Sequence, residues 1–99
     1  MIIILRNEIT KKLGLTVFSE FPKETIYFFE KANHCTMLNM KFDIFLTFVD
    51  ENFKILEEIE AKIGKSYINT KAFGFIESEN QISPKELYKL KQKYETIRP

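Results

Sequence analysis

The stretch MKFDIFLTF, residues 40–48, alternates between two kinds of side chain with a period of two. One row is apolar throughout and consists of Met40, Phe42, Ile44, Leu46 and Phe48. The other row holds polar residues and one aromatic residue, Phe45. Successive side chains of a strand point to opposite faces of its sheet, so the pattern predicts a strand with one apolar face. We expect this strand to be the centre of the fold.

The residues after this strand are spaced as in a helix. Apolar side chains recur at intervals of three and four over residues 51–63, at Phe53, Leu56, Ile59 and Ile63. Asp50 precedes them as an N-cap residue and Gly64 follows them as a stop signal. Such a pattern predicts an amphipathic helix over residues 51–63.

A second helix is predicted over residues 84–97. Ser83 and Glu86 have the spacing of a capping box, and Pro84 occupies the first helical position. A third helix is expected over residues 22–32, although the run Ile26, Tyr27, Phe28, Phe29 suits a strand as well.

The remaining apolar segments predict strands at residues 1–6 and within residues 66–78, with a further short one at residues 15–18. Together the elements predict an α+β fold: a small mixed sheet of three or four strands with two or three helices packed mainly on one face. The chain of 99 residues has no linker or repeat, so we expect residues 1–99 to form a single domain.

The amino-acid composition limits the cellular locations and the classes of partner that we expect. Hydrophobic residues make up 44% of the chain and charged residues 29%, and the net charge is +1. A net charge this small gives no strong electrostatic field, so we expect that the molecule as a whole does not attract nucleic acid or an anionic membrane. The apolar run after Met1 is too short for a signal peptide or a membrane span, and one cysteine forms no internal disulfide. We therefore expect a cytoplasmic protein without membrane contact.

His34 and Cys35 are the only residues of their types, and their adjacency prevents them from acting together. Neighbouring side chains point apart on a strand and do not face each other on a helix. A structural zinc site needs about four Cys or His ligands, and no phosphate-binding loop or nucleophile motif is present. We therefore expect no catalytic residue, no metal, no cofactor and no enzymatic activity.

Two segments resemble the motifs of one nucleic-acid-binding family. KAFGFIES, residues 71–78, is similar to the RNP1 octamer of the RNA recognition motif, and IFLTFV, residues 44–49, is similar to its RNP2 hexamer. This resemblance implies that Phe45, Phe73 and Phe75 form one aromatic sheet face beside Lys71. Unpaired bases of single-stranded RNA or DNA would stack on that face.

Other partners are consistent with the same residues. The first third of the chain is rich in apolar side chains, which would cover the aromatic face themselves or be buried against another protein molecule. Lys85, Lys89 and Lys93 form a basic stripe at i, i+4 spacing, which would meet phosphate or an acidic protein, although a solvated helix face is the commoner explanation.

Our leading hypothesis is a small non-enzymatic binding module that acts by protein–protein contact, with a protein partner or with itself as a homodimer. Small size, nearly neutral charge and the lack of a catalytic motif are also typical of accessory or inhibitor proteins encoded by phages and other viruses. Binding of single-stranded nucleic acid through Phe45, Lys71, Phe73 and Phe75 is the alternative.

Overall fold

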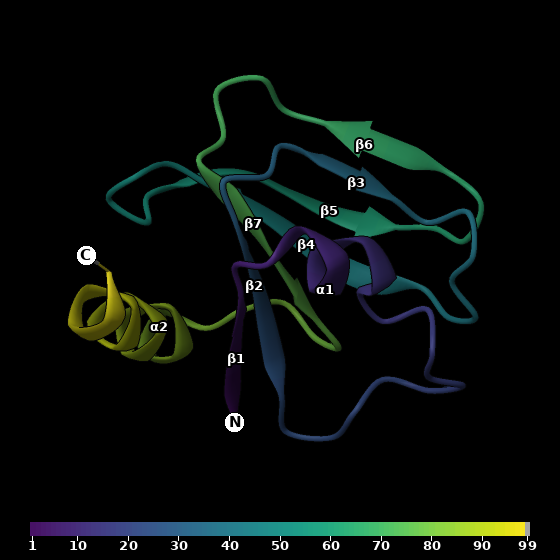
Figure 1. The fold of residues 1–99 in the computed structure, drawn as a ribbon, viewed down its shortest axis with the longest axis horizontal. Helices are drawn as coiled ribbons and strands as arrows, with labels where there is room; N and C mark the ends of the chain where they lie inside the picture. Colours follow the sequence, from purple (N-terminus) through teal and green to yellow (C-terminus); the bar gives the residue numbers. More distant parts are fainter. Residues whose placement is uncertain (99) are drawn as a thin grey trace.

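The computed structural model describes residues 1–98 and places seven strands and two helices in them. In chain order these elements are β1 (Ile2–Leu5), α1 (Glu8–Leu13), β2 (Ile26–Glu30), β3 (His34–Thr36), β4 (Ile44–Val49), β5 (Ile55–Ala61), β6 (Ser66–Ile68), β7 (Gly74–Ser78) and α2 (Pro84–Ile97). Five strands form one sheet in the order β1-β2-β7-β4-β5, and β3 pairs with β6 in a second sheet (Figure 1). Only β1 and β2 are parallel among the paired strands described.

The expected fold class is wrong, because the molecule is mostly sheet and has one main helix. Residues 55–61 of the helix predicted over 51–63 form β5, which is antiparallel to β4. Asp50 does not cap a helix. Its Oδ1 accepts hydrogen bonds from the backbone N–H groups of Asn52 (2.8 Å) and Lys54 (3.0 Å), which closes the turn between β4 and β5. Since an Asp side chain stabilises turns and helix starts in the same way, the sequence signal was ambiguous.

The helix predicted over residues 22–32 is also wrong, because Ile26–Glu30 is the strand β2. Both sides of this strand are buried: Phe28 packs on one face of the sheet and Phe29 on the other. A segment that is apolar on both faces suits an interior strand of aromatic and β-branched residues. The strand predicted at residues 15–18 is likewise absent there, where the chain turns after α1.

Other predicted elements are confirmed. β1 lies within residues 1–6, and β4 occupies the second half of the predicted central strand. The helix over 84–97 is α2, and both hydrogen bonds of the Ser83–Glu86 capping box are formed. The segment 66–78 contains two short strands, β6 and β7, rather than one.

Both faces of the five-stranded sheet are covered. On one face, Leu90 and Tyr94 of α2 pack in a cluster with Phe28 and Ile76. On the other face, Phe29, Leu46, Phe48 and Phe75 are covered by Leu15, Cys35 and Met37, which come from the turn after α1 and from the segment around β3. Figure 1 shows α2 beside β1, and α1 in front of the sheet. The expectation that helices pack mainly on one face therefore missed the second layer.

Gly74 lets the central strands approach closely. A Cβ atom at this position would lie 2.6 Å from the backbone oxygen of Phe29 and 2.7 Å from the ring of Phe28. Real side chains do not approach this closely, so the packing of β7 against β2 requires a glycine here.

The outer strands carry features that discourage further strand pairing. The edge strand β5 exposes Glu57, Glu58 and Glu60, and at the opposite edge Lys93 of α2 donates to the carbonyl oxygen of Ile2 (2.6 Å). Charged side chains at a sheet edge oppose pairing with another chain. Neither helix within residues 1–98 combines the length and the apolar character needed to cross a membrane.

Candidate functional site

The three predicted aromatic residues do not form one open surface. Phe75 is 3% exposed and stacks on Phe29 with ring centres 4.6 Å apart, in the layer beneath Leu15 and Cys35. Phe73 lies on the opposite side of the sheet, where its ring meets Tyr94 of α2 at 5.9 Å. β4 and β7 are neighbours, as the resemblance to the RNA recognition motif requires, but Phe48 rather than Phe45 is the register partner of Phe75. The predicted shared face of Phe45, Phe73 and Phe75 is therefore wrong.

The predicted basic residues are exposed, and of these only Lys71 lines a groove together with Phe73 and Phe75. Lys71 lies in the turn before β7. Lys85, Lys89 and Lys93 follow one side of α2, and among the side-chain hydrogen bonds found in residues 1–98 only Lys93 donates one. Lys93 thereby ties this stripe to the edge strand β1.

His34 and Cys35 lie on β3 and point to opposite sides, so that His34 is exposed and Cys35 is buried. The geometry agrees with the expectation that they do not form a pair. The partner of Cys35 is instead Glu77 of β7, whose Oε2 accepts a hydrogen bond from Sγ (3.3 Å). Burial, together with the neighbouring carboxyl group, raises the pKa of the Cys35 thiol far above its ordinary value. A thiol held protonated in this way is a poor nucleophile.

Glu77 is the most unusual residue of the sheet. It lies in the middle of β7 with Tyr27 and Leu46 as its register partners, and it is only 5% exposed. Burial raises its pKa to about 7, although the thiol of Cys35 donates to one of its oxygens. The other oxygen, Oε1, has no hydrogen-bond partner in residues 1–98. Such a carboxyl group is costly in a core, because it is desolvated without full compensation.

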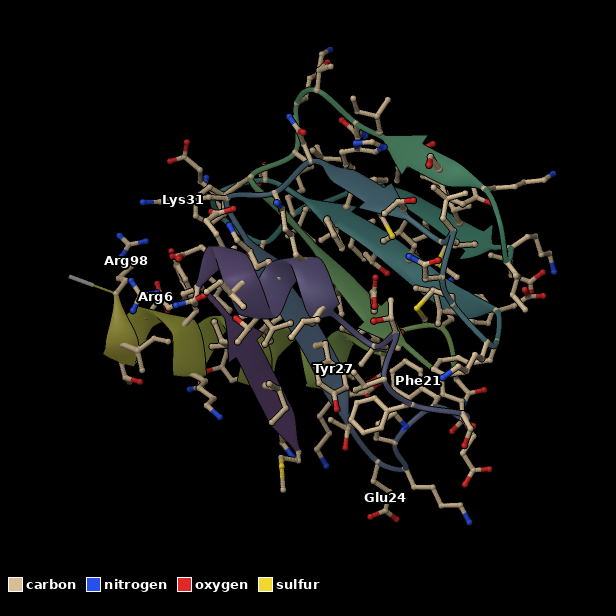
Figure 2. All side chains as sticks on the ribbon, turned by 45° about the vertical axis from the view of Figure 1, so that its right-hand side comes forward. Arg6, Phe21, Glu24, Tyr27, Lys31 and Arg98 are labelled. Carbon is tan, nitrogen blue, oxygen red and sulfur yellow. The ribbon has the colours of Figure 1, made fainter. Side chains whose placement is uncertain are left out.

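A second buried carboxylate, Glu30, is fully paired. Its oxygens accept hydrogen bonds from Tyr94 of α2 and from Arg6 Nε (3.0 Å). Burial raises the pKa of Glu30, but these two bonds outweigh it, so that the net pKa lies below its ordinary value. Arg6 also donates to the carbonyl oxygen of Ile97 (3.3 Å), and Figure 2 shows it at the end of α2 next to Arg98. This network holds α2 against β1 and β2 and is structural.

The short helix α1 presents its apolar side to solvent. Ile9 is 69% exposed and Leu13 52% exposed, and Val17 just beyond the helix is 64% exposed. Lys11 on the opposite side of the helix faces the protein: its side chain is 10% exposed and its Nζ donates to the backbone oxygen of Glu30 (2.9 Å). In a typical surface helix the apolar face is the buried one. The polarity of α1 is therefore reversed.

Sequence reasoning missed both features. Glu77 was counted as one residue of an RNP1-like octamer, and its alternation with Phe75 on β7 was the signal that it shares a face with a core aromatic. Ile9 and Leu13 have i, i+4 spacing, but residues 8–13 lack the longer periodicity that identifies a helix.

No family model, curated protein or solved structure matches the chain. Within residues 1–98, no three His, Cys, Asp or Glu side chains come together in a group that could hold a metal ion.

Proposed function

We propose that the chain is a non-enzymatic binding module that acts by protein–protein contact, and that the contact surface is the outer face of α1. The observation that supports this most directly is the reversed polarity of α1, with Ile9 and Leu13 outward and Lys11 inward. Exposed apolar side chains that gather on one element favour association, because burying them removes apolar surface from water.

A second copy of the chain is the partner that best fits the charges around this face. Glu8 and Lys12 are exposed at opposite ends of α1, on the same side of the apolar pair. If two copies of α1 pack antiparallel about a twofold axis, Glu8 of one copy lies opposite Lys12 of the other, and Ile9 and Leu13 meet in the centre. Such a surface is complementary to itself, as a twofold interface requires.

The size of the surface sets the expected affinity. A helix of six residues buries far less than the roughly 800 Å² per partner of a standard stable interface. We therefore expect reversible dimers with a Kd in the micromolar to millimolar range, and tighter binding only where a partner also reaches Val17 and Phe18.

Sedimentation velocity over a range of concentrations from micromolar to millimolar tests the proposal. The chain should shift reversibly from monomer to dimer, and Leu13→Glu should abolish the shift. Ile68→Glu, at an exposed apolar residue of β6, is the matched control and should leave association unchanged. Glu8→Lys and Lys12→Glu should each weaken the dimer, and the double variant should restore it. A chain that remains monomeric throughout, or that Leu13→Glu and Ile68→Glu affect equally, refutes the proposal.

Base stacking gains no support as a second function. The ring of Phe75 is buried beneath Leu15 and Cys35, and the ring of Phe73 contacts Tyr94 of α2. Stacking needs an open ring face for each base.

A further inference from the structure

A groove of about 980 Å³ lies between α1, the segment around β3 and the turns before β5 and β7. Its buried lining residues include Phe29, Phe75 and Glu77 of the covered sheet face and Leu15, Cys35 and Met40 from segments outside that sheet. Pockets for small molecules typically have volumes of about 300 to 1,000 Å³ and combine apolar walls with a few polar groups. The groove has both properties, since Glu77 is a carboxyl group among aromatic and aliphatic side chains.

Glu77 is poorly explained by the stability of the fold. Its register partners on either side are Tyr27 and Leu46, and an apolar residue would fill the same position without a desolvation cost. Cys35 satisfies Oε2 only, and within residues 1–98 Oε1 is left without a partner. A buried polar group with an unmet hydrogen bond, in the lining of a groove, is typical of a binding site whose ligand supplies the missing bond.

We infer that this groove binds a small, uncharged organic molecule that presents an amide or lactam N–H to Oε1 of Glu77 and packs its apolar body against the apolar side chains of the lining. The rings of Phe29 and Phe75 both line the groove, and they stack on each other at 4.6 Å. Each ring is only 3% exposed, so the pair forms a packed apolar floor beside the carboxyl group rather than an open stacking face.

The amide or lactam class follows from the two forms of the carboxyl group. Ionised Glu77 accepts a hydrogen bond from an N–H group, and protonated Glu77 can in addition donate to the adjacent C=O. An amide or lactam edge has both groups side by side and is bound in either form. A cationic amine is disfavoured because it would lose its hydration inside the groove. The charged residues of the lining do not compensate for this loss, because the exposed lysines Lys12, Lys31 and Lys71 are matched by the acidic residues Glu8, Asp50 and Glu51.

The test uses pairs of probes with the same body and different hydrogen bonding. The pairs are 2-pyridone with N-methyl-2-pyridone and benzamide with N,N-dimethylbenzamide, and each is titrated into the ¹⁵N-labelled chain and followed by NMR. We expect 2-pyridone and benzamide to shift the amide signals of β3 and β7. The affinity of the methylated analogues should be at least about tenfold lower, because they leave the carboxyl group of Glu77 unpaired.

Glu77→Met is the matched variant, because it keeps the length of the side chain and removes the acceptor. It should fold and should bind both members of each pair equally. Glu77→Gln, which keeps an amide in the same place, should retain part of the preference for the N–H probes and serves if the Met variant does not fold. Benzylammonium, a cationic amine, tests whether the groove prefers an uncharged ligand. Equal binding of N–H and N-methyl probes by the unmodified chain, no binding up to the solubility limit, or tighter binding of benzylammonium than of benzamide overturns the inference.

Discussion

Replacing Glu77 by glutamine should stabilise the folded chain at alkaline pH and leave it nearly unchanged in mild acid. Burial raises the pKa of Glu77 to about 7 in the folded chain, from an ordinary value of 4.5. The folded state therefore binds the proton more tightly than the unfolded state does. Stability from this group is fully present below the ordinary pKa and is lost as the pH rises through the folded pKa.

The size of the effect follows from the two pKa values. One unit of pKa corresponds to about 1.4 kcal/mol, so the difference between 4.5 and about 7 is equivalent to ~3 kcal/mol. The titratable groups that face Glu77 do not confuse the result, because Cys35 and Tyr27 both have pKa values raised by burial and stay protonated from mild acid to mild base. Glu30, with its lowered pKa, changes stability only at a lower pH.

The assay is urea unfolding followed by circular dichroism at about pH 5 and about pH 8. The unmodified chain should lose about 2.5 kcal/mol between these conditions, because at pH 5 part of the full difference is already lost. The free energy of unfolding of Glu77→Gln should be nearly the same at both pH values. Glu79→Gln removes an exposed carboxylate two residues away and should show the same loss as the unmodified chain. If the unmodified chain is equally stable at both values, or if Glu77→Gln follows the same pH dependence, Glu77 is not the desolvated group described here.

Four further substitutions test the strand packing, a buried hydrogen bond and the helix cap. Gly74→Ala should lower the free energy of unfolding by several kcal/mol or prevent folding, because its Cβ would lie 2.6 Å from a backbone oxygen. Gly64→Ala is the control: it has open space around it and φ of +84°, and it should cost only ~1 kcal/mol in urea unfolding. Tyr94→Phe should lower the free energy of unfolding by about 1–3 kcal/mol, because Glu30 loses a buried hydrogen bond; an unchanged unfolding midpoint would exclude that role. Ser83→Ala should cost ~1 kcal/mol and reduce helical circular dichroism, because the capping box is lost.

The elements that could be predicted were those whose local sequence signals fit only one type of secondary structure. The helix α2 has a capping box, a proline at its first position and a repeating apolar face, and all three signals agree. The central strand β4 was likewise clear, because strict alternation of Ile44, Leu46 and Phe48 fits no helix.

The rest depended on contacts between distant residues. Residues 51–63 have the spacing of a helix, and the pairing of residues 55–61 with β4 overrides it. The exposed or buried state of Phe75 depends on whether the segment around β3 covers the sheet, and no local signal in Ala32–Met40 indicates that it does. The candidate site was missed for the same reason: Cys35 and Glu77 are 42 positions apart in the sequence.

The contacts between the two ends of the chain have a consequence for how it folds. Lys93 binds the carbonyl oxygen of Ile2 and Arg6 binds that of Ile97, and each pair is separated by 91 positions. During synthesis, residues 2–6 are made long before these partners exist. Until these partners are made, the apolar residues of β1 are exposed and prone to associate with other chains. The loop that must close between the two ends of the chain is long, which also slows folding. Refolding rate and the yield of non-aggregated protein should therefore be limited by the docking of α2.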